Sequence, residues 1–381
     1  MKTKARLIAL GLLFMSAAGW AQNFTSGSDG SYGPLNITTD TTLDVPANGI
    51  FNCTTINVVV NKTLKFRRND ANTPVYLLAT GDVSVSGRID VSGGPGNNVV
   101  GGTAGPGGFD GGSPGSVSVP PGSGYGPGAG HGGTSGIDAP GAGGGAFGTV
   151  GQGGGSTNKG TVYANALLIP LVGGSGGGGT AGTPGNGGGG GGGAILVAST
   201  TRIDISGGSI YANAGGSSYT GGSGGALRLV APIVAGNGQI QVTSPFGCGY
   251  GRIRIDAIDR TQMNFNFVDP SVTSVGSLLM VFPTPLPRLD IIEAAGKAIP
   301  EGSPSVLLQL PFGSSPNRTI KVQARDFNTQ VPITVVLTPD HGTPISYTGT
   351  INNAGALNPA VLPFDVVLPV NEQVTVNVFS K

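Results

Sequence analysis

Residues 193–216 of the chain read GAILVASTTRIDISGGSIYANAGG, and this stretch decides the fold. An aliphatic run ends in a short turn, after which apolar residues alternate with polar ones. A glycine break then leads into a second alternating run. Alternation with a period of two, rich in β-branched residues, is typical of β-strands. The stretch therefore predicts three short strands in close succession.

Two further segments have the same layout: 74–94 (PVYLLATGDVSVSGRIDVSGG) and 225–247 (GALRLVAPIVAGNGQIQVTSPFG). A fourth copy begins at 251–258, and residues 41–66 alternate in the same way. The alignment places apolar residues at two equivalent strand positions. The first position is occupied by Val83/Val85, Ile203/Ile205 and Ile233. The next position is occupied by Ile89/Val91, Ile210/Ala212 and Ile240/Val242. One such unit cannot bury its apolar face, whereas stacked units bury a continuous core. We therefore predict a parallel β-helix, with an antiparallel sandwich as the alternative.

The N-terminus has the features of a secretory signal peptide. Lys2, Lys4 and Arg6 precede an apolar core, and small residues end the segment at Ala21. We therefore expect a secreted protein, extracellular or at the cell surface. Removing these three cations leaves 17 basic residues from 20, against 19 acidic ones, a net charge of about −2. This charge argues against a nucleic-acid partner, and the remaining chain has no apolar run long enough to span a membrane.

Glycine is concentrated between the first two copies, and residues 187–193 are seven consecutive glycines. Many glycines there recur every third residue, the period of an extended polyproline-II-type helix. The longest such series is Gly173, Gly176, Gly179, Gly182, Gly185, Gly188 and Gly191. We interpret the block as an insertion at a coil corner, either a polyglycine-II-like bundle or a disordered loop. A bundle requires an anchor, and residues 162–172 (VYANALLIPLV) are the aliphatic candidate.

The composition changes after a proline-rich segment, FPTPLPR at 282–288. Seven strand-like runs follow: LDIIEAA, SVLLQL, TIKVQAR, ITVVLT, ISYTGTI, PFDVVL and QVTVNVF. Their number and spacing favour an immunoglobulin-like sandwich that folds independently of the rest. The predicted division is 1–21 signal peptide, 22–94 N-terminal coils, 95–192 glycine-rich insertion, 193–281 C-terminal coils, 282–288 hinge and 289–381 sandwich.

Acidic residues on the predicted coils are of interest for catalysis, because glycosidases use two carboxylates. The candidates are Asp82, Asp90, Asp204 and Asp256. The near repeats RIDVSGG (88–94) and RIDISGG (202–208) suggest an acidic and basic ladder on one face. The simpler interpretation, which we favour, is that these residues are solvated and that Arg88–Asp90 and Arg202–Asp204 are surface pairs.

Other catalytic, metal and cofactor sites have little support. His131 and His341 are far apart in glycine-containing turns, and we expect both to be exposed loop residues. They offer little to a metal centre or a Ser/His/Asp triad. No phosphate-binding loop or calcium repeat is complete. We predict no catalytic residue, metal or cofactor. Cys53 and Cys248 either pair in an oxidising compartment or remain as buried thiols.

Aromatic residues are the remaining candidates for ligand contact. They either form contact points at loop tips or pack on glycine backbones. The six are Phe109, Tyr125, Phe147, Tyr211, Tyr219 and Tyr250.

Residues 41–258 resemble a group of glycine-rich secreted bacterial proteins, through GDVSVSGRIDVSGGPG, the glycine insertion, GGSGGALRLVA and GRIRIDA. The resemblance implies an extracellular or cell-surface β-helix and no particular site residues. From the sequence we expect a non-enzymatic structural or adhesive protein, which self-assembles or binds cell-surface polysaccharide. A polysaccharide-binding or polysaccharide-degrading protein is the alternative. Ice binding is a weaker one, since no regular Thr-x-Thr array is present.

Overall fold

The computed structural model describes residues 24–134, 141–153, 158–217, 220–267 and 270–380. This part of the chain is nearly all β, with strands β1–β23 and three short 3-10 helices. The helices are η1 (Pro245–Gly247), η2 (Pro270–Val272) and η3 (Gly355–Leu357). The predicted all-β class is therefore confirmed, while the predicted signal peptide lies outside the described residues. In that described part, no helix has the length and apolar character needed to cross a membrane.

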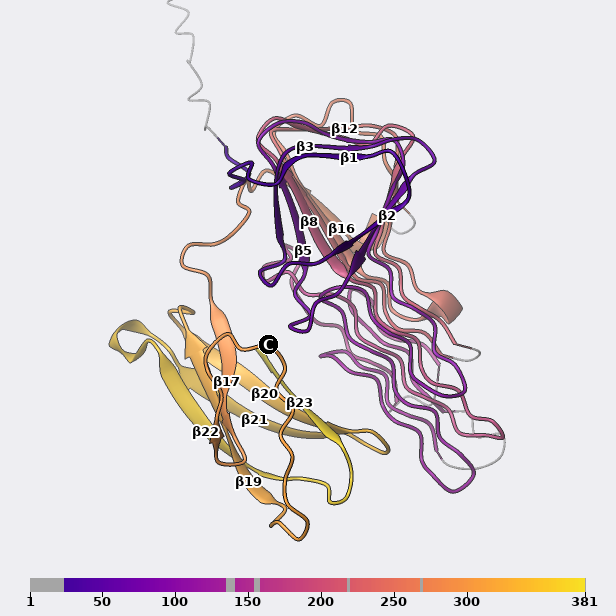
Figure 1. The fold of residues 1–381 in the computed structure, drawn as a ribbon, viewed down its shortest axis with the longest axis vertical. Helices are drawn as coiled ribbons and strands as arrows, with labels where there is room; N and C mark the ends of the chain where they lie inside the picture. Colours follow the sequence, from indigo (N-terminus) through magenta and orange to yellow (C-terminus); the bar gives the residue numbers. More distant parts are fainter. Residues whose placement is uncertain (1–23, 135–140, 154–157, 218–219, 268–269, 381) are drawn as a thin grey trace, which may run out of the picture.

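Strands β1–β16 form two parallel sheets (Figure 1). The larger sheet has the order β12-β9-β6-β3-β5-β8-β11-β14-β16, with β1 also paired to β3. Its strands are β1 (Gly33–Ile37), β3 (Ile50–Val58), β5 (Val75–Ala79), β6 (Val83–Val85), β8 (Ala194–Ser199), β9 (Arg202–Asp204), β11 (Ala226–Val230), β12 (Ile233–Ala235), β14 (Arg252–Asp256) and β16 (Thr273–Gly276). The smaller sheet, in the order β15-β13-β10-β7-β4-β2, contains β2 (Thr41–Asp44), β4 (Thr63–Arg67), β7 (Arg88–Asp90), β10 (Ser209–Tyr211), β13 (Gln239–Gln241) and β15 (Asn266–Phe267).

The aligned segments occupy equivalent places in these sheets. Strands β5, β6 and β7 pair in parallel with β8, β9 and β10, which in turn pair with β11, β12 and β13. Figure 1 shows the resulting turns of chain stacked around a common interior. We call strands β1–β16 and this interior the coil stack.

One predicted register is wrong by a residue. Ile89, Ile210 and Ile240 are aligned as expected. However, Val234 and not Ile233 lies opposite Ile203. The cause is a shorter connection, because Ala198 and Val230 are paired but the next paired residues come four positions later at Arg202 and only three positions later at Ile233. Accordingly, the Val234 side chain is buried and Ile233 is only half-buried.

Alternating side chains fill the interior of the coil stack. Inward residues of every turn join one cluster of buried aliphatic side chains. Fully buried members include Val83, Ile89, Ile203, Ile210 and Leu229. Fully burying such a side chain contributes ~1.5–3 kcal/mol. The period-two pattern of the sequence is therefore the source of this core.

The glycine-rich insertion leaves the coil stack after β7 and returns at β8, and two shorter glycine-rich loops leave the same corner after β10 and β13. Figure 1 shows these segments extended side by side, away from the coil stack. We call the described parts of 92–193, 212–225 and 243–251 the glycine slab. Its segments bond through their backbones: Gly112 donates to Gly177, Gly177 to Gly189 and Gly188 to Gly112, each at 2.9 Å.

Hydrogen bonds in the slab repeat every third residue. Gly174 and Gly177 donate to one neighbouring segment, at Gly192 and Gly189. Gly176 and Gly179 donate to a different neighbour, at Tyr125 and Gly122. The predicted period of three is confirmed, and the described part of the insertion is ordered by these bonds.

The predicted anchor of the slab is also confirmed. Leu168 and Leu171, from the aliphatic stretch 162–172, are 1% and 7% exposed. They belong to a second apolar cluster on the outer surface of the larger sheet, with Leu78 and Leu196. The slab is thus attached to the coil stack by side-chain burial as well as by the chain itself.

Residues 288–380, which we call the tail, form two antiparallel sheets. Their orders are β18-β17-β19-β22 and β21-β20-β23. The strands are β17 (Arg288–Ala294), β18 (Lys297–Ala298), β19 (Asn317–Arg325), β20 (Gln330–Pro339), β21 (Ile345–Asn352), β22 (Ala360–Val367) and β23 (Val374–Ser380). Buried side chains from both sheets meet in one core.

One of the seven strands predicted for the tail is absent there. Residues 305–310 (SVLLQL) form no strand, and Leu307 is 87% exposed. Pro304 and Pro311 flank the segment and lack the amide hydrogen that a sheet requires. The other six runs lie in β17 and β19–β23.

The proline-rich segment does not keep the tail away from the rest. The Gly342 amide donates to the Pro121 carbonyl of the slab at 3.2 Å. The rings of Phe109 and Phe379 meet edge to face, with centroids 5.8 Å apart. The tail therefore touches the slab, and its independent folding stays a prediction.

Candidate functional site

The aromatic candidates do not form one site. Phe109 and Tyr125 lie where slab and tail meet, since Phe109 contacts Phe379, and burial together with the Asp340 charge raises the pKa of Tyr125. Phe147 is 0% exposed and packs on Tyr163, so it offers no surface to a ligand.

The other three candidates are also apart. Tyr211 lies on the smaller sheet under the Arg88 guanidinium, 4.7 Å from its ring centre. Tyr250 packs on the apolar core at the slab corner. Tyr219 lies outside the described residues.

The two near-identical heptapeptides occupy different faces of the coil stack. Arg88 and Asp90 are in β7 of the smaller sheet, whereas Arg202 and Asp204 are in β9 of the larger sheet. The ladder on one face is therefore wrong. Arg202 does pair with Asp204, at 2.8 Å. Arg88 instead lies over Tyr211, and Asp90 accepts the Ser92 amide at 3.0 Å.

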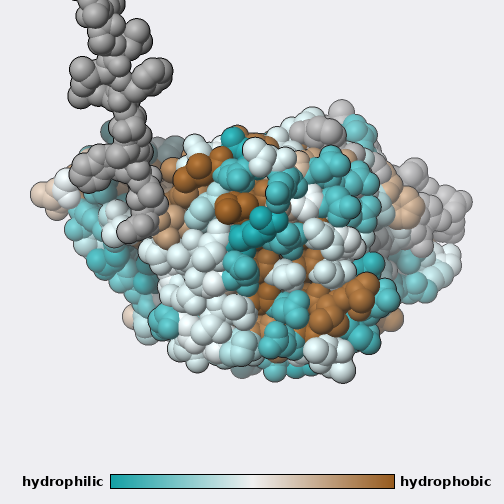
Figure 2. All heavy atoms as spheres, turned by 90° about the horizontal axis from the view of Figure 1, so that it is seen from above, coloured by the Kyte–Doolittle hydropathy of each residue, from teal (hydrophilic) through white to brown (hydrophobic). Residues whose placement is uncertain are grey.

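A polar hollow lies beside Arg202 and Asp204 on the outer face of β9 and β12. It has a volume of about 290 Å³. Figure 2 looks onto the side of the molecule where Figure 1 labels β1, β3 and β12, and shows hydrophilic side chains there beside smaller apolar patches. We call this polar hollow the β9–β12 hollow. The residues that line it are Arg202, Asp204, Ser206, Ala235, Gly236, Asn237, Gln262 and Asn264.

Three successive turns of chain position these residues. Strand β9 supplies Arg202 and Asp204, and the corner after β12 supplies Asn237. The next turn carries Gln262 and Asn264, and is held in place by a parallel bridge between Gly236 and Met263. The hollow is therefore a product of stacking and is absent from any single turn.

Hydrogen bonds hold the charged groups of the hollow. Arg202 donates through Nη2 to Asp204 Oδ2 at 2.8 Å and to Gln262 Oε1 at 3.0 Å. The Ser206 hydroxyl donates to the other oxygen of Asp204. The Ser206 bond and Arg202 lower the pKa of Asp204. At the rim, bonds from Thr261 lower the pKa of Asp259.

The hydrogen bonds to Asp204 and Asp259, with the lowered pKa values that they cause, bear on what the hollow can do chemically. A general acid near neutral pH needs a carboxyl group that retains its proton, which means a raised pKa. Asp204 and Asp259 have the opposite shift, so both are ionised hydrogen-bond acceptors. Within the described residues, no three His, Cys, Asp or Glu side chains gather as metal ligands do. The arrangement fits binding through hydrogen bonds.

A second hollow, of about 450 Å³, lies on the tail between β17, β19 and β22. Its two carboxylates, Glu293 and Asp365, are engaged with neighbours, whereas the buried Nε of Arg318 has no hydrogen-bond partner among the described residues. Lys321 pairs with Glu293 at 2.8 Å, and Asp365 accepts the Thr319 hydroxyl at 2.8 Å. These contacts tie strands of the tail together.

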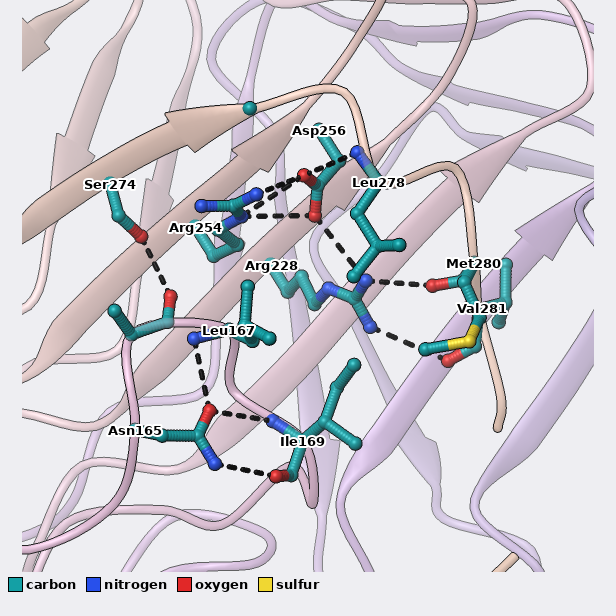
Figure 3. Close-up of polar contacts among 12 residues, drawn as sticks. Asn165, Leu167, Ile169, Arg228, Arg254, Asp256, Ser274, Leu278, Met280 and Val281 are labelled. Atoms are coloured by element: carbon teal, nitrogen blue, oxygen red, sulfur yellow. Dashed lines mark hydrogen bonds and ion pairs between the residues drawn. The ribbon is translucent and has the colours of Figure 1, made fainter. Parts of the chain in front are cut away.

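Asp256 is not solvated, contrary to the sequence-based interpretation. Its side chain is 0% exposed and lies between two arginines, as Figure 3 shows. Arg254 donates to Asp256 through Nη2 at 2.6 Å, and Arg228 does so at 3.3 Å. The Leu278 amide donates to Oδ1 at 3.0 Å, and the Met280 carbonyl accepts from Arg228 at 2.7 Å. Residues 278–281 thus cover the cluster.

The sequence contains a signal for this cluster that we missed. Arg228 and Arg254 each interrupt an aliphatic run, in LRLV and IRID, and they are opposite each other in β11 and β14. Burial lowers the pKa of Arg228, whose side chain is 1% exposed. The cluster is enclosed and does not face solvent, so it is structural.

The cysteines and histidines take no part in the hollow. Cys53 and Cys248 are both buried and unpaired with each other, and burial raises the pKa of Cys53 to about 11. His131 and His341 are half-buried, which corrects the expectation that both are exposed. Burial lowers the pKa of His131.

Comparison of the chain with family models, curated proteins and solved structures finds no match.

Proposed function

We propose that this chain is a secreted, non-enzymatic structural or adhesive protein of the cell surface or extracellular matrix. In this proposal the coil stack is a parallel β-helix, the glycine slab is a polyglycine-II-like bundle and the tail is an immunoglobulin-like sandwich. The observation that carries it is the backbone bonding of the slab. Segments that are joined by their own amides and carbonyls make a stiff arm where a flexible linker would be expected.

The energetics support a stiff arm that depends on its attachment. Each slab hydrogen bond contributes a net ~0.5–1.5 kcal/mol, whereas ordering a residue costs ~1–2 kcal/mol. The free energy gained from backbone hydrogen bonds alone therefore roughly equals the entropic cost of ordering the slab. Leu168 and Leu171, buried on the coil stack, supply the missing stabilisation. A stiff arm suits a protein that holds a surface or matrix contact at a distance from its own core.

The second candidate is a polysaccharide-binding or polysaccharide-degrading protein. The β9–β12 hollow favours binding within this pair, because Asp204 and Asp259 are stabilised in their ionised forms. A hydrolase would require one of them to protonate a leaving group.

Adhesion and degradation are separated by one experiment. Beads coated with the purified protein should be retained on extracellular matrix material under flow, more than beads coated with an inert protein. The same material, incubated with soluble protein, should release no new reducing ends or unsaturated products. Retention equal to that of the inert protein would overturn adhesion. Products that disappear with Asp204→Asn would overturn the non-enzymatic function.

A further inference from the structure

We infer that the β9–β12 hollow binds an uncharged polysaccharide chain. This inference rests on the proposed adhesive function and names the class of ligand. The hollow offers hydrogen-bond acceptors at Asp204 and amide groups at Asn237, Gln262 and Asn264. Sugar hydroxyls are both donors and acceptors, so they match this mixture. Asn237, Gln262 and Asn264 are exposed and accessible to a polymer.

The charges around the hollow disfavour an acidic polymer. Asp82, Asp204 and Asp259 lie on this face, and Arg202 is already bonded to Asp204 and Gln262. The other nearby cation, Arg260, donates to the carbonyls of Ala257 and Gly276. A uronate chain would therefore meet like charges, and the two nearest cations already have partners of their own. An uncharged chain avoids that repulsion.

The shape of the site favours a chain over an isolated sugar. A volume of about 290 Å³ is near the lower limit for a small-molecule site, ~300 Å³, so the hollow holds only a short stretch of ligand. Polar side chains continue from it along neighbouring turns. Asp204 is opposite Ser84, Ser84 opposite Asn57 and Asn57 opposite Asn36. At ~4.8 Å per strand, this row extends the contact by ~14 Å.

Affinity electrophoresis tests the inference with named probes. Native gels containing galactomannan, xyloglucan or dextran should retard the protein, and retardation by at least one should persist in 0.5 M salt. Gels containing polygalacturonate or alginate should not retard it. The double variant Gln262→Ala with Asn264→Ala should weaken the apparent affinity at least about fivefold. Asn264→Ala alone, which disturbs Arg202 less, should weaken it in the same direction.

The matched control is Gln239→Ala with Gln241→Ala, which removes two amides from the smaller sheet on another face. It should leave retardation unchanged, and the melting temperature should confirm that every variant folds. If both double variants lose retardation equally, or if neither loses it, the inference is overturned. So would retardation by only the acidic polymers. If no polysaccharide retards the protein while coated beads still adhere to matrix, this inference fails and the adhesive function stands.

Discussion

The coil stack and the glycine slab are both made of parallel runs of extended chain, but different atoms hold them together. In the coil stack, side chains such as Ile203 and Ile210 are fully buried between turns. In the slab, a side chain at Gly188 or Gly191 would overlap the carbonyl of a neighbouring segment. The comparison teaches that one chain uses the presence of side chains for cohesion in one region and their absence in the next.

The difference extends to how each region tolerates polar groups. The segments of the slab bond to one another mainly through their own backbone amides and carbonyls. The coil stack buries a charged cluster, Arg228–Asp256–Arg254, which requires specific side-chain partners. Damage to the slab should therefore depend on volume, and damage to the cluster on charge.

The largest effect is expected in the slab. Gly188→Ala with Gly191→Ala places two methyl groups against the backbones of Gly177 and Gly174. We expect loss of folding or a destabilisation above ~4 kcal/mol, the range reserved for severe lesions. Gly94→Ala is the control, because its nearest neighbour is the Thr103 hydroxyl at 3.2 Å. Thermal unfolding measures both, and equal melting temperatures would show that slab packing does not require bare backbone.

The charged cluster should give the next largest effect. Asp256→Ala leaves Arg228, at 1% exposure, without its carboxylate, which typically costs ~3–5 kcal/mol. Asp204→Ala removes a half-exposed pair and should cost ~0–1 kcal/mol. Replacing all three residues together, by Arg228→Leu, Arg254→Leu and Asp256→Val, should restore most of the loss. Urea titration measures the free energy of unfolding of each variant. Similar losses of stability for Asp256→Ala and Asp204→Ala would contradict the role of burial.

The anchor between the two regions comes third. Leu168→Ala removes a buried side chain and should destabilise the protein by ~2–5 kcal/mol. The adjacent Leu167 is 40% exposed, and Leu167→Ala should stay within ~0.5 kcal/mol. Hydrogen exchange should then show faster exchange in the slab than in the coil stack of the Leu168 variant. Uniform exchange across both regions would argue that the slab is held without this anchor.

The smallest effect is expected where the tail meets the slab. Phe109→Ala removes the ring contact with Phe379, worth ~0.5–1.5 kcal/mol beyond its buried area. The tail should remain folded, because its core is its own, but protease should cleave residues 282–288 faster. Phe312→Ala, at a 97% exposed position, is the control. Residues 289–381 expressed alone should also unfold cooperatively; an unfolded fragment would show that the slab contact is essential.

Much of the fold could be predicted from local patterns. Alternation determines which side chains of a strand face inward, and this identified Ile89, Ile203, Ile210 and Ile240 as core. Glycines at intervals of three indicated a bonded array, because only a residue without Cβ permits backbones to approach so closely. The stretch 162–172 stood out as the anchor because it is the one aliphatic run inside the insertion.

The alignment of the units places RIDVSGG at the second strand position and RIDISGG at the first, although their local patterns are the same. Only the tertiary structure showed that these two positions belong to different sheets. A corner shorter by one residue shifted Ile233 out of register. Asp256 resembles Asp204 in sequence, but residues 278–281 cover it. The hollow, too, depends on turns far apart in sequence. Alternation is a local property of the chain. Strand register, the burial of a side chain under another segment and the residues that surround a hollow depend on contacts that only the stacking of turns creates.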